Sequence, residues 1–389
     1  MPPSRRESVP TIVFALFRND PAGQMTGGTR SNLEIVSRLR RFRPVVVTNI
    51  NDDFVKLATA AGVKVHFVRF GDPGKGFKGS ALLHRVRGLW DVLRTNLYIA
   101  RIAFKERAWA VQVDEVQAYL AFLGARLAGS RLLVFVRNGL PNHSLRARYR
   151  IPMLFATAIL CLSNEMVAML KRRMPDRFKD RIRQHYNAVS MDGLASAPPS
   201  WDRTHFRQAA GWPDDAMVVL VVGFVDARKR QAEFLRALAT HPHPKMHIAI
   251  VGPAKDDAEW RKCHEIVELH ALPVTFHGYQ ADVSPWYRAA DVVALPSSAE
   301  GVPRAILEGA GAALPAVAFD IPGCREAILH GRTGLLVASM EELIASLCQL
   351  EQSPELRQAL GEAGRAHVLE SFEARRNVER LEELYQEIV

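Results

Sequence analysis

The chain has 389 residues, a length at which two domains are more common than one. With 48% hydrophobic and 24% charged residues it has the composition of an ordinary globular protein. No apolar run approaches the roughly 20 residues that a membrane-spanning helix needs, and the first ten residues are not followed by the apolar core of a signal peptide. The four cysteines are scattered, which excludes the paired spacings of zinc and redox motifs and favours free thiols in a reducing, cytoplasmic setting.

The charge is divided unevenly along the chain. Residues 1–200 hold 32 Lys and Arg against 14 Asp and Glu, whereas the remainder holds 19 and 27. A strongly basic half indicates an anionic partner, and nucleic acid, an anionic membrane surface and an acidic acceptor all meet that description. Composition does not distinguish among the three.

Apolar strands and amphipathic helices alternate through the first half, which predicts a parallel sheet covered on both faces. A polar loop that contains Gly27 and Gly28 follows the first strand, and a long basic helix is expected over residues 81–107. The expected strands are residues 11–17, 44–48, 63–70, 108–113 and 132–136.

A glycine-rich segment after the third strand has the form of a dinucleotide-binding fingerprint. It runs from Gly74 through Gly76 to Gly79 and precedes the long basic helix. The fingerprint belongs after the first strand of such a sheet and is followed about 20 residues later by an acidic residue, and neither condition is met here. The two lysines among the glycines favour a basic surface loop instead.

The alternation starts again after Ser196–Ser200, a proline-containing linker candidate. We therefore predict an α/β chain with two tandem Rossmann-like, doubly wound parallel-sheet domains, residues 1–195 and 196–370, and a final helix in residues 371–389. In the second half the expected strands are residues 217–222, 246–251, 274–276, 292–295 and 315–319, and the expected helices at the end are residues 341–349, 354–370 and 374–388.

The stretch from Asp291 to Gly323 combines the groups that bind a phosphate and those that bind hydroxyls. Pro303 is predicted to be the first residue of a helix, whose free N–H groups and dipole favour an anion. Glu300 lies before this helix and Glu308 inside it, and an ionised glutamate accepts hydrogen bonds from neighbouring sugar hydroxyls. Two carboxylates are also the machinery of a glycosidase, but a phosphate-binding helix terminus suits an activated sugar better.

Lys229 is expected to reach the same place. It begins the helix that follows the strand at 217–222, and the carboxyl ends of parallel strands share one edge of a sheet. No Asp-x-Asp follows any apolar run, so a Mg²⁺ or Mn²⁺ clamp on a diphosphate lacks obvious ligands. Lys229 and the helix terminus would then neutralise the diphosphate.

Taken in order, these motifs resemble those of retaining glycosyltransferases with the GT-B fold, in the GT4 group, over nearly the whole chain. The glycine loop at Gly27 and Gly28 is similar to the one that faces donor and acceptor across the cleft between the two domains. Gly223 to Lys229 resembles the Gly-Arg-Leu…Lys-Gly motif, and Glu300 with Glu308 the E-x7-E signature. Gly323 to Glu326 resembles the family's Gly-x-x-Glu turn, and Tyr186 to Asp192 resembles the segment before the interdomain hinge. The final helix resembles the one that crosses back onto the first domain.

The resemblance implies a role for each matching residue. Glu300 would contact the donor sugar, Glu308 the ribose and Lys229 the diphosphate. Asn138, beside Arg137, stands where many members have a catalytic His. The remaining residues implied in donor binding are Gly28, Gly223, Arg228, Gly301, Val302 and Pro303.

Two other departures from the family pattern have physical consequences. Phe224 replaces the arginine of Gly-Arg-Leu, so one diphosphate cation is missing and Arg228 is expected to substitute for it. Ala313 stands where glycine is usual, at a cost of about 1 kcal/mol if the position requires a left-handed backbone.

The implied function is the metal-independent transfer of a hexose from a nucleotide-diphosphate sugar, with no cofactor, to a cell-surface glycan or lipid-linked acceptor in polysaccharide biosynthesis. The basic first half would hold the acceptor and contact an anionic membrane as a peripheral protein, in the cytoplasm or at the inner face of the cell membrane. No nucleic-acid partner is expected. Two alternatives stay open: an NAD(P)-dependent enzyme using Gly74 to Gly79, and a non-catalytic protein that binds a membrane or polyanion.

Overall fold

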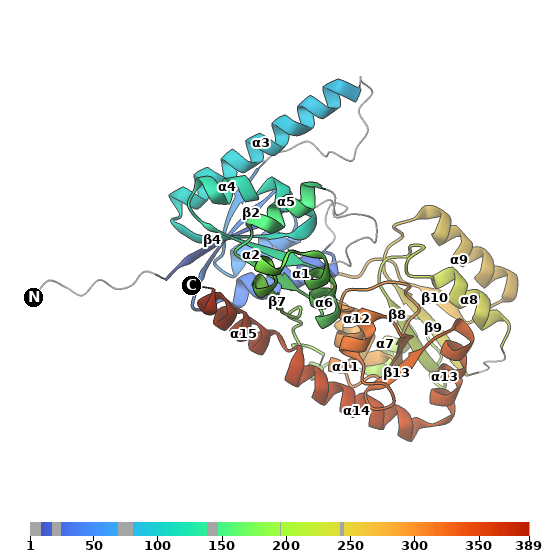
Figure 1. Cartoon of the computed structure of the whole chain (residues 1–389). Coiled ribbons are helices and arrows are strands. Elements are labelled where there is room, and N and C mark those ends of the chain that lie inside the picture. The colour runs from blue at the N-terminus through green and yellow to red at the C-terminus, as the bar shows by residue number, and fades with distance from the viewer. Residues whose placement is uncertain are drawn as a thin grey trace, which may run out of the picture. The chain divides into compact units, whose positions relative to one another are not determined.

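The computed structural model describes residues 9–17, 25–68, 81–137, 147–194, 196–241 and 245–388, with the backbone alone in residues 81–87, 115–116 and 147–149. The chain divides into two compact units. The first unit is Met1–Ala188 with Arg375–Val389, and the second is Val189–Ala374. Each unit contains a sheet with helices on its faces (Figure 1). The chain therefore passes from one unit to the other at residue 188, ahead of the linker candidate Ser196–Ser200, and its last helix belongs to the first unit.

The sheet of the first unit has seven parallel strands in the order β3-β2-β1-β4-β5-β6-β7. Its central strands are continuous apolar runs because helices cover both faces, and every residue of β1 is buried. The strands are β1 (Thr11–Leu16), β2 (Arg43–Thr48), β3 (Lys64–Phe67), β4 (Ala108–Asp114), β5 (Arg131–Val136), β6 (Ala158–Cys161) and β7 (Ile182–Gln184).

The last helix of the chain is anchored to this sheet by buried polar contacts. The Tyr385 hydroxyl donates a hydrogen bond to Gln112 of β4, and a Glu382 carboxylate oxygen accepts from the backbone N–H groups of Arg40 and Arg41, both at 2.6 Å. The helices of the unit are α1 (Gly27–Arg38), α2 (Asp53–Ala60), α3 (Ala81–Lys105), α4 (Phe122–Leu127), α5 (Ala147–Phe155), α6 (Asn164–Arg173) and α15 (Ala374–Glu387), with short 3-10 helices at Glu115–Leu120 and Asp176–Arg181.

The sheet of the second unit has six parallel strands in the order β10-β9-β8-β11-β12-β13. They are β8 (Met217–Val222), β9 (Met246–Val251), β10 (Val274–Phe276), β11 (Val292–Leu295), β12 (Ala316–Phe319) and β13 (Gly334–Val337). The helices are α7 (Arg203–Ala209), α8 (Gln231–Ala239), α9 (Asp257–His270), α10 (Ser284–Ala289), α11 (Arg304–Gly311), α12 (Pro322–Ala327), α13 (Met340–Gln352) and α14 (Pro354–Ser371).

The predicted fold class is confirmed, and the bounds of four strands, β8 to β11, match the sequence prediction. The strands that the prediction missed, β6, β7 and β13, have three or four residues each; β7 and β13 are edge strands of their sheets, and β6 lies next to β7. Part of the apolar run Ile151–Leu162 forms the end of α5, and the rest forms β6. All four cysteines are free. None of the described helices is both long and apolar enough to cross a membrane.

Strand order reverses once in each sheet, and this reversal positions the candidate site. In the first unit the chain builds outward from β1 to β3 and then returns to the other side of β1 with β4. In the second unit the same reversal lies between β8 and β11. Open α/β sheets bind ligands beyond the carboxyl ends of the strands at such a switch point. We therefore expect a ligand site at the loops after β8 and β11.

Candidate functional site

A glycine follows the carboxyl end of each of the strands β8 and β9. Gly223 follows β8 with φ 142° and Gly252 follows β9 with φ 148°, a backbone region that other residues rarely adopt. A Cβ atom added to Gly252 would lie 2.0 Å from the Gly223 carbonyl oxygen. A side chain at either position would fill space beside the switch point, so the glycines keep this edge of the sheet open to a ligand.

Lys229 reaches the switch point from the loop after β8. Its backbone N–H donates to an Asp226 carboxylate oxygen at 3.0 Å, and its side chain runs beside Gly223. Its Nζ lies 2.8 Å from Glu300 Oε1, and both side chains are only 11% exposed. The loops after β8 and β11 are also joined by the backbone, because the Ser298 N–H donates to the Arg228 carbonyl at 2.9 Å. A cation and a carboxylate 71 residues apart in sequence thus meet where the prediction placed them.

Arg228 provides a second cation at the same carboxylate. Its Nη1 donates to Glu300 Oε1 at 2.9 Å and to the Ala299 carbonyl at 2.7 Å, and its side chain is 44% exposed. Burial alone would raise the pKa of the Glu300 carboxyl, but the charges of Lys229 and Arg228 outweigh that effect and hold the pKa below its ordinary value. Glu300 is therefore ionised near neutral pH, with two positive groups around it.

The loop that carries Glu300 packs closely against a third glycine. Gly323, at the start of α12 after β12, packs so closely that a Cβ on it would lie 1.5 Å from the Gly301 carbonyl oxygen. The backbone N–H groups of Gly301 and Val302 have no hydrogen-bond partner among the described residues. Two donors therefore stand next to the Glu300 carboxylate, at the entrance to α11.

Helix α11 begins at Arg304, so the prediction that Pro303 is its first residue is off by one position. Pro303 is the residue that precedes the helix, and its carbonyl accepts from the N–H groups of Ile306 and Leu307. The physical argument is unchanged, because the unpaired N–H groups and the positive end of the helix dipole still lie at this end. The first turn of α11 adds favourable electrostatics for an anion beside Lys229.

Glu308 lies one turn further along α11 and is nearly buried. Its Oε1 accepts from Arg304 Nε at 3.1 Å and Nη2 at 2.8 Å, and its Oε2 accepts from the Tyr287 hydroxyl at 3.1 Å. A carboxylate offers about four lone-pair positions, so these three bonds leave one on Oε2. Arg304 and Tyr287 fix the orientation of the carboxylate and leave it one acceptor position for a ligand hydroxyl.

Residues 216–353 match the family model described as glycosyl transferases group 1. The matched segment covers most of the second unit, which is therefore a domain similar to the glycosyl transferases group 1. All the residues above that surround Glu300 and Glu308 lie within this domain.

Curated relatives match about half of the chain. A D-inositol 3-phosphate glycosyltransferase of Paenarthrobacter aurescens (strain TC1) is 27% identical over 227 residues, 54% of this chain and 55% of that protein. One from Saccharomonospora viridis (strain ATCC 15386) is 30% identical over 231 residues, 54% of this chain and 53% of that protein. The chain thus spans about half the length of the curated relatives it matches.

Solved glycosyltransferases share the fold of the whole chain. The crystal structure of Anabaena Alr3699/HepE in complex with UDP and glucose aligns with a TM-score of 0.81 and 20% sequence identity, over 97% of this chain and 99% of that one. The fold class is therefore that of the GT-B glycosyltransferases. The prediction that the two units face each other across a cleft stays a prediction.

The predicted residues of the first unit are only partly described. Gly28 lies in the first turn of α1, which is capped by the Thr26 hydroxyl accepting from the Thr29 N–H at 3.3 Å. Asn138 and the segment Gly74 to Gly79 lie outside the described residues. Arg137 is described, and its side chain is 7% exposed.

Arg137 holds the first unit together at its own switch point. Its guanidinium donates to Asp114 at the end of β4 (2.9 Å), to Asn32 of α1 (2.5 Å) and to Asn187 beyond β7 (2.5 Å). It also lies over the Phe135 ring, 4.1 Å from the centroid. These contacts tie four segments together, so the structure gives Arg137 a structural role in the first unit.

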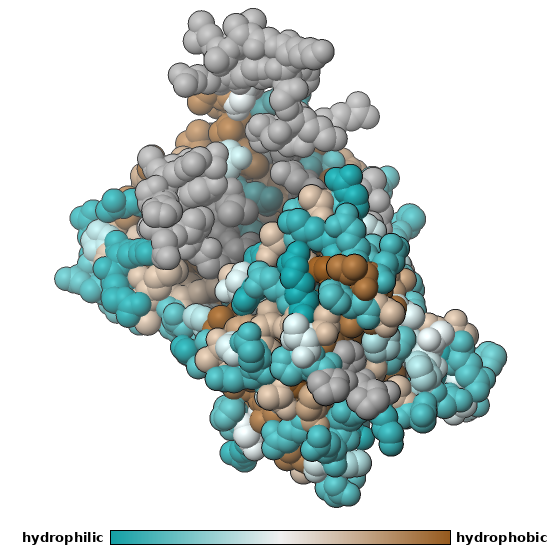
Figure 2. Space-filling view, turned by 90° about the vertical axis from the view of Figure 1, so that its right-hand side faces the viewer, coloured by the Kyte–Doolittle hydropathy of each residue, from teal (hydrophilic) through white to brown (hydrophobic). Residues whose placement is uncertain are grey.

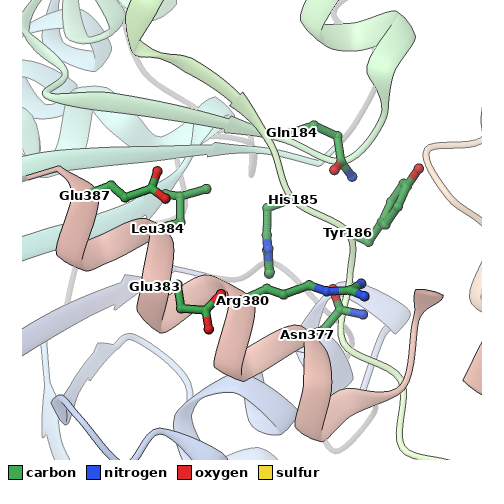
Figure 3. A pocket seen from close by; sticks show the side chains of 8 residues that line it. All are labelled: Gln184, His185, Tyr186, Asn377, Arg380, Glu383, Leu384 and Glu387. Atoms are coloured by element: carbon green, nitrogen blue, oxygen red, sulfur yellow. The ribbon is translucent and has the colours of Figure 1, made fainter. Parts of the chain in front are cut away.

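The first unit also has a pocket, between β7 and α15 (Figure 3), with a volume of ≈ 220 Å³. The His185 side chain points toward α15, and its Nε2 has no hydrogen-bond partner among the described residues. Burial lowers the pKa of His185 to about 3, so the imidazole is neutral. Arg380 lines the same pocket together with Glu383, a mixture of charges that gives no particular preference for a diphosphate.

Sequence reasoning missed three residues that shape the domain's site. Arg304 had a usable signal, because a position four residues before Glu308 on one helix places the two side chains together. Gly252 follows an apolar strand just as Gly223 does, which was also visible in the sequence. Tyr287 gave none, since its contact with Glu308 depends on how α10 packs against α11.

Proposed function

We propose that the protein is a retaining glycosyltransferase that moves a hexose from a nucleotide-diphosphate sugar to a cell-surface glycan or lipid-linked acceptor. The observation that carries this proposal is the meeting of Lys229, Arg228 and Glu300 at the switch point of the group 1 domain. The crystallised complexes of HepE with UDP and glucose and with UDP-glucose support a nucleotide-sugar donor.

The diphosphate is the group that the cations and free amides bind. When it enters, Lys229 exchanges its contact with Glu300 for a phosphate oxygen, and the N–H groups of Gly301 and Val302 donate to it as well. Charge-assisted bonds of this kind hold the leaving diphosphate as negative charge develops on it. Lys229 and Arg228 take the place that a metal ion would occupy.

Glu300, once released from Lys229, accepts hydrogen bonds from the hydroxyls of the donor sugar. Glu308 uses its one remaining acceptor position for the ribose. The spacing of the two glutamates along the entrance and first turns of α11 matches the division of a nucleotide sugar into a sugar at one end and a ribose at the other, with the diphosphate between. Retention at the reacting carbon is proposed from the resemblance of this signature to that of retaining enzymes.

The acceptor side belongs to the first unit. Its excess of Lys and Arg suits an anionic acceptor or a lipid-linked one at an anionic membrane. We place the enzyme in the cytoplasm, as a peripheral protein at the inner face of the cell membrane.

Calorimetric titration with UDP, GDP, ADP and UDP-glucose tests the donor half directly. Glu308→Ala removes the ribose acceptor, and we expect nucleotide affinity to fall about tenfold or more. Glu308→Gln keeps one acceptor oxygen and is expected to lose less. Glu342→Ala, an exposed glutamate of α13 in the same unit, is the matched control and should bind as the unmodified protein does. Circular dichroism checks that each variant is folded, and unchanged affinity in a folded Glu308→Ala variant contradicts the assignment.

Turnover separates the proposal from its alternatives. Slow release of free sugar from a nucleotide sugar without acceptor excludes a non-catalytic binding protein. Retention on an immobilised dinucleotide, with no nucleotide-sugar binding, would instead favour the nicotinamide-dependent alternative.

A further inference from the structure

One face of α3 in the first unit is apolar and exposed to solvent. Over the residues of α3 whose side chains are described, we define the apolar stripe as Leu89, Trp90, Leu93, Leu97 and Phe104, which are 70%, 61%, 41%, 51% and 77% exposed. In Figure 1 the N-terminal half of α3 extends beyond the sheet of its own unit, and Figure 2 shows hydrophobic surface just below the grey atoms at the top of the molecule. Large apolar side chains gathered on one exposed helix face mark an interaction surface.

The spacing of these residues makes the stripe continuous. Leu89, Leu93 and Leu97 recur every four residues, and at 100° per residue all five side chains lie within an arc of about 100° on the helix. The opposite face of the same helix is buried, through Thr95, Asn96, Ile99, Ile102 and Ala103. The stripe is therefore a second apolar face, separate from the one that belongs to the core.

The buried face holds α3 firmly against α4, so the stripe cannot turn inward. The Asn96 side chain donates to the Tyr119 carbonyl at 3.0 Å and accepts from the Gly124 N–H at 3.0 Å. A Cβ atom on Gly124 would lie 2.4 Å from the Asn96 carbonyl oxygen, which shows how closely the two helices approach. Rolling α3 to cover the stripe would break these contacts.

Positive charge borders the stripe. Arg94 and Arg101 lie on one side of it and Lys105 ends the helix, all three exposed. Asp91 is the one acidic residue in the sequence of α3, and its carboxylate is 3.6 Å from Arg94. Apolar side chains flanked by arginines, with an exposed tryptophan among them, are the features of a helix that lies in the interface of an anionic bilayer.

We propose that the apolar stripe of α3 inserts into the surface of an anionic lipid bilayer, with α3 lying in the plane of the interface. The leucines and Phe104 enter the acyl boundary, Trp90 occupies the headgroup level, and Arg94 and Arg101 extend their side chains to the lipid phosphates. A second copy of this chain fits less well, because two such faces would bring arginines against arginines with a single Asp91 on each side. The inference rests on the proposed placement of the protein at an anionic membrane and names the surface that makes the contact, and it is independent of the proposed donor site.

Co-sedimentation of the full chain with vesicles tests the proposal. We expect binding to vesicles that contain phosphatidylglycerol and little binding to phosphatidylcholine alone. The double variant Leu93→Ser/Leu97→Ser should reduce the affinity about tenfold or more, since two apolar side chains no longer leave water. Because both leucines are exposed, the variant keeps its core. Leu269→Ser is the matched control, an exposed leucine (79%) of α9 in the second unit, and should bind vesicles unchanged.

Trp90 reports insertion separately from adsorption. Its fluorescence should shift to the blue on anionic vesicles, and Trp90→Phe should remove that shift while the vesicles still bind. Equal binding by the double leucine variant, or equal binding to neutral and anionic vesicles, overturns the proposal. Self-association that the double variant abolishes, without vesicle binding, also overturns it and assigns the stripe to a second copy. UDP titration of the same variants is expected to be unchanged, which keeps a failure here distinct from a failure of the donor site.

Discussion

The two units place an arginine or lysine at equivalent switch points and use it differently. In the first unit Arg137 is 7% exposed, and its guanidinium donates to Asp114, Asn32 and Asn187. In the second unit Lys229 and Arg228 share a single oxygen of Glu300, and Arg228 is 44% exposed. Arg137 holds protein segments together. Lys229 and Arg228 instead lie near a loop whose backbone N–H groups, among the described residues, have no partner.

This difference shows that the fold supplies a place for a site without deciding its use. The buried guanidinium of Arg137 donates through Nε, Nη1 and Nη2 to three different protein acceptors, so moving it to a ligand would break contacts among several segments. Two positive charges contact one oxygen of a carboxylate that carries a single negative charge. One of the two cations can therefore leave Glu300 and bind a phosphate oxygen at little electrostatic loss. We therefore expect the switch point of the first unit to be structural and that of the second unit to bind a ligand.

The largest expected effect comes from removing the structural cation. Arg137→Ala should lower the free energy of unfolding of the first unit by about 3–5 kcal/mol, because it leaves Asp114 and two buried amides without their donor. Hydrogen exchange during denaturant unfolding measures it and assigns the loss to one unit. Arg228→Ala is the matched exchange at the other switch point and should change stability by about 1 kcal/mol or less. Similar losses in the two variants would remove the distinction.

Next in size is the effect of the binding cation on ligand affinity. Lys229→Ala should weaken UDP binding about 10- to 100-fold, as expected for one lost charge-assisted bond, with little change in stability. Calorimetric titration gives the affinity, and thermal unfolding without ligand is the control. If Lys229→Ala destabilises the second unit as much as Arg137→Ala does the first, then Lys229 is structural as well.

A smaller effect concerns the backbone just past the end of α11. Ala313 has φ 60°, so the condition under which alanine costs about 1 kcal/mol at this position, a left-handed backbone, is met. Ala313→Gly should raise the free energy of unfolding of the second unit by about 0.5–1 kcal/mol, the relief of strain less the added freedom of the unfolded chain. Ala312→Gly, at φ −85°, is the neighbouring control and should lower it instead. A loss in both variants would mean that Ala313 is not strained.

The smallest effect is a dependence on pH at the binding switch point. Since the pKa of Glu300 is lower in the folded protein than its ordinary 4.5, the carboxylate stabilises the fold above about pH 4.5, and this contribution is lost as pH falls through the folded value. The stability difference between the protein and Glu300→Gln should be constant from neutral pH down to about 5 and shrink below. A difference that grows on acidification would contradict this sign.

Much of the fold and of the candidate site could be predicted from local patterns. The strands β8 to β11 are apolar runs bounded by polar loops, and their limits could be found without tertiary information. Edge strands such as β7 could not, because three residues with an exposed arginine carry no periodicity. Glu300 and Glu308 were identified from their spacing around Pro303, but the Tyr287 contact that orients Glu308 was not.

The sequence by itself determined the alternation of strands and helices, the glycines at the strand ends and the two glutamates around α11, because each of these depends on neighbours a few residues away. Only the tertiary structure decided which protein groups each of these basic residues contacts. Arg137 contacts Asn32 across 105 residues of sequence, and Lys229 meets Glu300 because strand order reverses between β8 and β11. Strand pairing is a long-range choice, and the chemistry of both switch points depends on it.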